Sequence, residues 1–192
     1  MIEQKAELRT RMRAQRLQLT PADVLARSQA ICARLVGMTA FMGARHVFAY
    51  VSRGNEVLTH DLIRDLLMDG KRVGVPAFDR ERNEYHASWI RHFPDDLQPG
   101  KLDILEPRAD HRRVVEWDQF EVLLIPGLAF DGRGHRLGRG KGYFDRMLER
   151  ATGVKIALAY DFEVLAEVPA AAHDVPMDFI VTETRVVRCE RK

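Results

Sequence analysis

The order of apolar segments between residues 46 and 76 constrains the fold more than any other feature of the sequence. Residues 46–51 (HVFAYV) and 72–76 (RVGVP) are short apolar runs typical of buried strands. Between them, residues 59–70 carry leucines and an isoleucine at helical spacing and end at a glycine. A strand, a helix and a strand in this order form a βαβ unit, in which the two strands are parallel.

The rest of the chain extends this pattern. Periodicity and capping residues predict further helices over residues 3–18, from Pro21 onward and over 142–150, and further strands over 84–90, 122–125, 155–160 and 179–182. We expect the strand over 84–90 to lie at a sheet edge, and residues 91–116 to form an excursion from the core. The sequence therefore predicts an α/β fold: a single three-layer domain over residues 1–192, with a mostly parallel sheet and helices on both faces.

Bulk composition argues against several classes of protein. The formal net charge of the 192 residues is only +2, which is too small to indicate a nucleic-acid binder. No apolar run approaches the roughly 18 residues of a membrane helix, and the charged N-terminal segment lacks the apolar core of a signal peptide. Cys32 and Cys189 lie far apart, without the spacing of a zinc or redox motif. We therefore expect a cytoplasmic protein with no nucleic-acid or membrane partner.

Residues 125–145 (IPGLAFDGRGHRLGRGKGYFD) carry the clearest chemical signal, because a buried strand, a glycine-rich cationic loop and a helix follow one another. The glycines are Gly127, Gly132, Gly134, Gly138, Gly140 and Gly142, and the cations are Arg133, Arg136, Arg139 and Lys141. Glycines let backbone amides turn inward, a helix N-terminus adds donors, and arginine grips phosphate oxygens with two hydrogen bonds. The segment predicts a phosphate site at the carboxyl end of the sheet, where open α/β sheets bind ligands.

Two common nucleotide motifs do not fit this loop. His135 stands where a Walker A motif ending at Lys141 needs its first glycine, and Gly142 replaces the serine or threonine that follows the lysine. Tyr143 occupies the place of the last glycine in a dinucleotide fingerprint that begins at Gly138. Two alternatives stay open from the residues alone. The loop could be a solvated basic segment, and Asp145 could stabilise the helix start rather than bind magnesium.

This segment closely resembles the signature of the 5-formyltetrahydrofolate cyclo-ligase family, also called methenyltetrahydrofolate synthetases. The stretches PGLAFD (126–131) and RLGRGKGYFD (136–145) match it in order and spacing. Further matches are Lys5-Ala6-Glu7-Leu8-Arg9, Asn55-Glu56-Val57, Gly70-Lys71-Arg72-Val73 with Pro76, Leu105-Glu106-Pro107, Pro169, His173-Asp174 and Ile180-Val181-Thr182-Glu183. The chain departs from the pattern at Phe144, where the family has a second tyrosine, at Glu163, where glutamine is frequent, and at Asp103, where glycine is usual.

The resemblance implies an ATP- and Mg²⁺-dependent enzyme that converts 5-formyltetrahydrofolate to 5,10-methenyltetrahydrofolate and releases ADP and phosphate. The residues it implies for ATP binding are Lys5, Arg9, Arg136, Leu137, Gly138, Arg139, Gly140, Lys141, Gly142 and Tyr143. The residues it implies for the folate are Glu56 and Tyr143, and those for magnesium are Asp145 and Asp174. We assign Lys141 and Arg139 as the catalytic residues, because they bring positive charge to the transferring phosphate.

Other interpretations of these residues remain. Lys5 and Arg9 share a helix face with further arginines, which is more often a solvated face than a site. Arg136 could clamp the loop, Glu56 could be a turn acid, and Tyr143 could simply pack against the following helix. The alternative function is an ATP-dependent kinase or ligase that uses the same loop on a different small substrate. We expect a monomer or weak dimer whose partners are a reduced formyl-folate and ATP.

Overall fold

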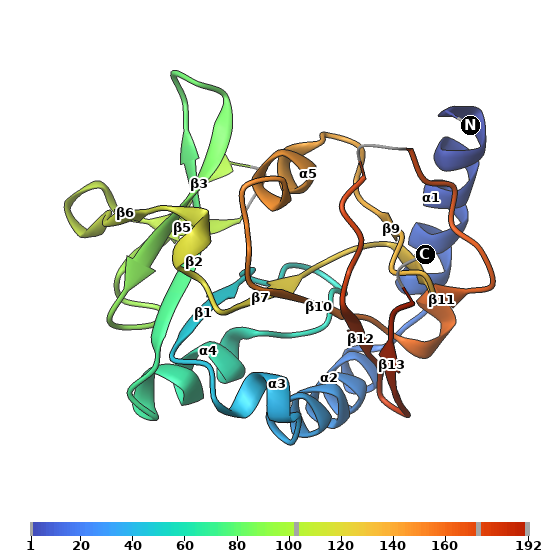
Figure 1. Ribbon diagram of the computed structural model, residues 1–192, viewed down its shortest axis with the longest axis horizontal. Helices are drawn as coiled ribbons and strands as arrows, with labels where there is room; N and C mark the ends of the chain where they lie inside the picture. The colour runs from blue at the N-terminus through green and yellow to red at the C-terminus, as the bar shows by residue number, and fades with distance from the viewer. Residues whose placement is uncertain (1, 102–103, 172–173, 191–192) are drawn as a thin grey trace.

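The computed structural model describes residues 2–101, 104–171 and 174–190. Its centre is an eight-stranded sheet in the order β13-β12-β10-β7-β1-β2-β3-β6 (Figure 1). The strands are β1 (His46–Ala49), β2 (Arg72–Asp79), β3 (Glu84–Ile90), β6 (Val114–Val115), β7 (Val122–Ile125), β10 (Val154–Leu158), β12 (Phe179–Val181) and β13 (Val186–Arg188). The five strands from β12 to β2 are parallel, and the outer strands are antiparallel. The predicted mostly parallel sheet is confirmed.

The strand over residues 84–90 does not lie at the edge of the sheet, so that prediction is wrong. β3 pairs with β2 on one side and with the short strand β6 on the other. Residues 91–116, predicted as an excursion, return to the sheet through β6 after forming a separate ribbon of β4 (Leu97–Pro99) and β5 (Leu105–Pro107). The prediction failed because β6 has only two residues, too few for a recognisable alternation.

Helices cover one face of the sheet thickly. They are α2 (Pro21–Val36), α3 (Thr39–Met42) and α4 (His60–Met68), which lie below the sheet in Figure 1. α2 begins where Thr20 and Asp23 form a capping box, as its sequence predicts. Side chains alternate along each strand, so Val47 and Ala49 face these helices while Phe48 faces the opposite side.

The opposite face has a thinner cover. It consists of α5 (Tyr143–Leu148), a 3₁₀ turn (Trp117–Gln119) and Phe130 from the strand β8 (Ala129–Asp131). β8 belongs to a small sheet with β9 (Arg136–Leu137) and β11 (Val164–Leu165). Both faces of the sheet are covered, which confirms the three-layer prediction. The cover on this second face is built more from loops than from helices.

Helix α1 (Ile2–Leu17) packs on the small sheet rather than on the central one. Leu8 and Met12 from its apolar stripe contact Leu128, Leu137 and Val168. In Figure 1, α1 therefore lies beside β9 and β11, away from α2, α3 and α4. This placement brings the first helix of the chain next to the glycine-rich segment.

Candidate active site

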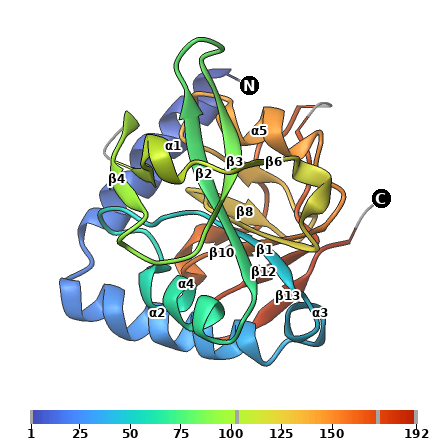
Figure 2. The same cartoon turned by 90° about the vertical axis from the view of Figure 1, so that its left-hand side faces the viewer.

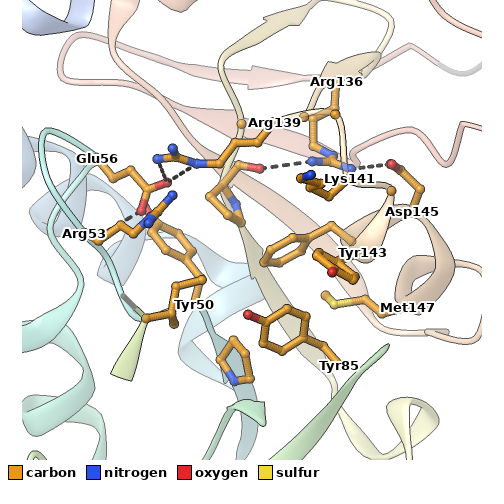
Figure 3. A pocket seen from close by; sticks show the side chains of 18 of the residues that line it. Tyr50, Arg53, Glu56, Tyr85, Arg136, Arg139, Lys141, Tyr143, Asp145 and Met147 are labelled. Atoms are coloured by element: carbon orange, nitrogen blue, oxygen red, sulfur yellow. Dashed lines mark hydrogen bonds and ion pairs between the residues drawn. The ribbon is translucent and has the colours of Figure 1, made fainter. Parts of the chain in front are cut away.

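A cavity opens at the carboxyl ends of the neighbouring parallel strands β1 and β7 (Figure 3). The cavity volume is about 90 Å³, and the cavity is partly open to solvent. Its lining comes from the turn after β1, the residues after β7, the glycine-rich loop and α5, and also from Pro76 of β2, Tyr85 of β3 and Ile104. The sequence predicted a site at this end of the sheet, and the cavity lies there.

The glycine-rich loop turns through conformations that favour glycine. Gly140 has φ of 97° and Gly142 has φ of 67°, both in the left-handed region that L side chains rarely adopt. Helix α5 begins directly afterwards but spans six residues, not the nine predicted over 142–150. Because so short a helix has only a small dipole, a phosphate at this loop would be held mainly by loop amides and cationic side chains.

Arginines of α1 hold the loop from behind. Arg9 Nε donates to the Gly138 carbonyl at 2.9 Å, and Arg13 Nη2 donates to the Arg139 carbonyl at 3.3 Å. In a trans peptide the C=O and N–H groups point in opposite directions. The amide groups of Arg139 and Gly140 therefore point away from α1, which leaves them available to a ligand on the other side of the loop.

The predicted cations of the site pair with its predicted carboxylates. Arg139 Nη2 lies 2.6 Å from Glu56 Oε1, and Lys5 Nζ lies 2.8 Å from Asp174 Oδ2. Arg136 binds Asp145 and donates to the Pro126 carbonyl at 3.3 Å, so it bridges the end of β7 and α5 (Figure 3). These pairs neutralise the charges of the residues that form them, and a charged ligand that binds any of these residues would have to displace its partner.

Lys141 differs from the other cations. It lines the cavity and makes no ion pair within the described part of the chain. An ammonium group without a protein partner can bind a phosphate oxygen without first breaking an internal ion pair. Lys141 is thus the cation best placed to receive a phosphate directly.

Glu56 is held rigidly although it lies in a turn. Its side chain has 8% relative exposure, and Oε2 accepts the Arg53 amide at 3.0 Å while Oε1 accepts from Arg139. A mobile turn acid would be exposed and would lack a backbone partner. The carboxylate instead lines the cavity in a fixed place, across from Tyr85 and Tyr143 in Figure 3.

Tyr85 and Tyr143 form the other wall of the cavity, and Phe78 packs behind them. Tyr143 meets Tyr85 edge-on with ring centroids 5.2 Å apart and Phe78 with centroids 6.0 Å apart. Burial raises the pKa of the Tyr85 hydroxyl, so this phenol stays neutral. Figure 2 shows the β2–β3 hairpin, which carries Phe78 and Tyr85, extending beyond the sheet on the same side as α5. The rings meet edge to face, and they make this wall of the cavity largely apolar.

Sequence reasoning missed several lining residues, which are Tyr50, Arg53, Tyr85, Ile104 and Met147. Tyr50 lies in the predicted strand over 46–51, and Arg53 lies between that strand and Glu56. Met147 lies in the helix that follows the loop, so adjacency in the sequence was the available signal for these three residues. Tyr85 and Ile104 come from segments whose approach to the loop depends on tertiary packing.

Four predicted ATP or metal residues do not line the cavity: Lys5, Arg9, Leu137 and Asp174. Lys5, Arg9 and Asp174 lie at the back of the loop, while the Leu137 side chain is buried against α1 with 1% exposure. Phe144, the departure from the family's second tyrosine, lies under the Arg136 guanidinium at 5.8 Å, where it needs no hydroxyl. His173 and Asp103, also named in the sequence comparison, lie outside the described residues.

Magnesium chemistry fits the two predicted carboxylates only in combination with a phosphate ligand. The described residues hold no group of three or more His, Cys, Asp or Glu that could bind a metal. Mg²⁺ on nucleotides commonly takes one or two carboxylates and completes its shell with phosphate oxygens and water. Asp145, whose side chain is 32% exposed at the end of the loop, is suited to that role.

The fold and the site together define an α/β protein whose cavity lies between a cationic glycine-rich loop and an aromatic wall at the carboxyl end of a parallel sheet. Residues 1–183 match the model of the 5-formyltetrahydrofolate cyclo-ligase family, and the chain belongs to that family. It is therefore an enzyme with 5-formyltetrahydrofolate cyclo-ligase activity, an ATP-dependent ligase of folate one-carbon metabolism.

Individual relatives agree with this assignment. The chain is 33% identical to a 5-formyltetrahydrofolate cyclo-ligase of Mycolicibacterium smegmatis, over 94% of each chain. It is 30% identical to that of Escherichia coli strain K12, with 91% of this chain and 98% of the other covered. The solved structure of Aquifex aeolicus 5,10-methenyltetrahydrofolate synthetase superposes with a TM-score of 0.86 at 32% identity, covering 98% of this chain and 94% of that one.

Proposed function

We propose that the cavity binds Mg²⁺-ATP along the glycine-rich loop and the reduced formyl-folate between Glu56 and the aromatic wall. The observation that carries the proposal is that one cavity holds both halves of such a site. Lys141 and the loop amides lie on one side, and a buried carboxylate faces the aromatic rings of Tyr85 and Tyr143 on the other. Neither a solvated basic loop nor a simple phosphate site would need the second half.

On the nucleotide side, we assign the amides from Gly138 to Gly142 and the side chains of Lys141 and Arg139 to the triphosphate. Arg136, Lys5 and Arg9 would contribute once their present partners are exchanged, and Leu137 would contribute through its backbone only. Asp145 and Asp174 would hold the magnesium ion, which would offset negative charge on the phosphates. We assign Lys5 and Asp174 to the site together, because Lys5 Nζ lies 2.8 Å from Asp174 Oδ2.

On the folate side, Glu56 would hydrogen-bond the pterin ring or fix the formyl group. Tyr143 would contact the ring, together with Tyr85 from the β2–β3 hairpin. When Arg139 turns to the triphosphate, it releases the Glu56 oxygen that it now occupies at 2.6 Å. Glu56 would remain in place through its bond to the Arg53 amide.

The reaction then proceeds in two displacements. The formyl oxygen attacks the γ-phosphorus, the bond from that phosphorus to the bridging oxygen breaks, and ADP leaves with the electron pair. The second folate nitrogen attacks the activated carbon and loses its proton, and the carbon–oxygen bond breaks as phosphate departs. The residues of the site position the two substrates and offset the charge on the phosphoryl group.

A spectroscopic assay tests this proposal. Purified protein is mixed with 5-formyltetrahydrofolate, ATP and magnesium, and the near-ultraviolet absorbance of the methenyl product is followed. We expect a rise that requires both ATP and magnesium, which Lys141→Ala lowers at least about 100-fold in kcat/KM. The matched control is Lys71→Ala, since Lys71 bonds the Met42 and Ala44 carbonyls instead of lining the cavity.

An absent rise in folded protein that still binds ATP would favour the alternative, an ATP-dependent kinase or ligase for another small substrate. The monomer-or-weak-dimer state and the cytoplasmic location stay proposals, tested by light scattering and by cell fractionation. No helix in the described ranges is long and apolar enough to cross a membrane.

A further inference from the structure

Arg16, in the last turn of α1, contacts residues on both sides of the cavity: Gly127 on the phosphate side and Asn55 on the folate side. The Arg16 side chain donates from Nη2 to the Gly127 carbonyl at 2.7 Å, and Gly127 lines the cavity where β7 enters the phosphate side. The Arg16 backbone carbonyl accepts from Asn55 Nδ2 at 3.1 Å. Asn55 directly precedes Glu56, the carboxylate of the folate side. One residue therefore connects the two halves of the site.

Arg16 is held in this place by a second charged residue. Its Nε donates to Glu163 Oε1 at 2.7 Å, and its Nη2 also contacts that oxygen. Glu163 is fully buried, and its Oε2 accepts the Tyr160 amide at 3.0 Å. The Arg16 side chain keeps only 9% exposure, and the guanidinium also lies 6.0 Å from the centre of the Tyr160 ring.

Stability alone explains this buried pair poorly. Removing two charges from water is costly, and apolar residues of similar volume often stabilise a core as well or better. Arg16 Nη1 is moreover buried with no hydrogen-bond partner among the residues described, which adds to the cost. The guanidinium does, however, supply a rigid planar fork that can fix a carbonyl and a carboxylate at once, which no apolar side chain can do.

The wall at Gly127 is fixed from two directions. A Cβ at this glycine would overlap the ring of Phe130, so the backbone lies directly on that ring. Arg16 holds the carbonyl of the same residue from the α1 side. A shift of the Arg16 fork would move the Gly127 carbonyl at the end of β7 relative to the Arg16 backbone, whose carbonyl holds Asn55 and thus the turn that carries Glu56.

We propose that Arg16, oriented by Glu163, is a positioning residue that sets the distance between the phosphate wall at Gly127 and the folate wall at Glu56. This inference rests on the proposed function, because it assumes that ATP and the folate occupy these two walls. A residue that aligns two substrates acts chiefly on kcat, since misplacement by about 1 Å can cost roughly 100-fold in rate. Binding of either substrate to its own wall depends on it much less.

The chain offers a matched control in Arg27 of α2. Its Nη1 lies 2.7 Å from Glu183 Oε1, so it is also a helix arginine paired with a distant glutamate. Neither Arg27 nor Glu183 lines the cavity. Arg16→Lys and Arg27→Lys make the same change of side chain, with and without a link to the site.

The experiment measures kcat and both KM values for the wild type, Arg16→Lys, Glu163→Gln and Arg27→Lys, with dissociation constants for a non-hydrolysable ATP analogue and thermal melts. We expect Arg16→Lys to lower kcat about 10- to 100-fold while the analogue still binds as in the wild type. Glu163→Gln is expected to lower kcat in the same direction, and Arg27→Lys to leave it unchanged.

Unchanged kcat in Arg16→Lys, or an equal loss in Arg27→Lys, would overturn the inference, as would a loss explained entirely by weaker analogue binding. If Arg16→Lys does not fold, Glu163→Gln decides by the same division between kcat and binding. Failure of the proposed function itself looks different, because the wild type would then not turn over 5-formyltetrahydrofolate.

Discussion

The buried carboxylate of Glu163 makes a specific prediction about how stability depends on pH. Burial raises its pKa from an ordinary 4.5 to about 7, against the opposing attraction of Arg16 and the hydrogen bond from the Tyr160 amide. Glu56 is the other charge that acts on it, and it also raises the pKa. The folded protein therefore binds a proton at Glu163 more tightly than the unfolded chain does.

The sign and size of the effect follow from linkage. A raised carboxyl pKa gives stability that is fully present below pH 4.5 and is lost as the pH rises through about 7. A tenfold difference in proton affinity between the folded and unfolded protein corresponds to about 1.4 kcal/mol, so the loss between pH 5 and pH 8 is about 2 to 3 kcal/mol. Glu163→Gln cannot titrate and should not show this loss.

Urea unfolding of both proteins at pH 5, 6, 7 and 8 measures the difference directly, because all other titrating groups are shared. We expect the free energy of unfolding of Glu163→Gln to increase relative to that of the wild type by about 2 to 3 kcal/mol from pH 5 to pH 8, because only the wild type loses stability. A constant difference would refute the reasoning. Such a constant difference would mean that Arg16 outweighs burial and that Glu163 is ionised throughout this pH range.

Three further changes test other parts of the structure. Gly140→Ala should raise the KM for ATP by about tenfold, since a φ of 97° strains any L side chain by about 1 to 3 kcal/mol. The control is Gly37→Ala, at a φ of −81°, which should leave the KM for ATP unchanged. Asp131→Ala should lower the free energy of unfolding by about 2 to 4 kcal/mol, because the buried carboxylate accepts the amides of Arg133, His135 and Val168; urea unfolding checks this, and unaltered stability would contradict it. Asp145→Asn should raise the magnesium concentration needed for half-maximal activity, because a neutral amide is a weaker ligand for this ion; an identical magnesium titration would remove Asp145 from the metal site.

Local patterns in the sequence predicted much of the fold. The buried runs at β1, β2 and β7 predicted a parallel sheet because both of their faces are covered, which makes them continuously apolar. The glycine-rich loop could be predicted as well, since residue type alone indicates both its backbone conformation and its charge. Gly140 and Gly142 do adopt the positive φ that such a loop needs.

Other features depend on contacts that no local pattern encodes. Sequence spacing placed Lys5, Arg9, Arg13 and Arg16 on one helix face and favoured a solvated surface for the last two. Docking of α1 on the small sheet turns that face to the loop, so Arg13 meets the Arg139 carbonyl and Arg16 is buried beside Glu163. Tyr85 reaches the cavity for a similar reason, because the β2–β3 hairpin brings it against Tyr143.

The central claim is that this cavity transfers the γ-phosphate of ATP to the formyl oxygen of the folate. The most direct test labels that oxygen with ¹⁸O, allows a single turnover with magnesium and ATP, and determines by mass spectrometry where the label appears. We predict that the released inorganic phosphate carries the label, because the carbon–oxygen bond breaks after the oxygen has joined phosphorus. Label recovered in water, with unlabelled phosphate, would contradict the account.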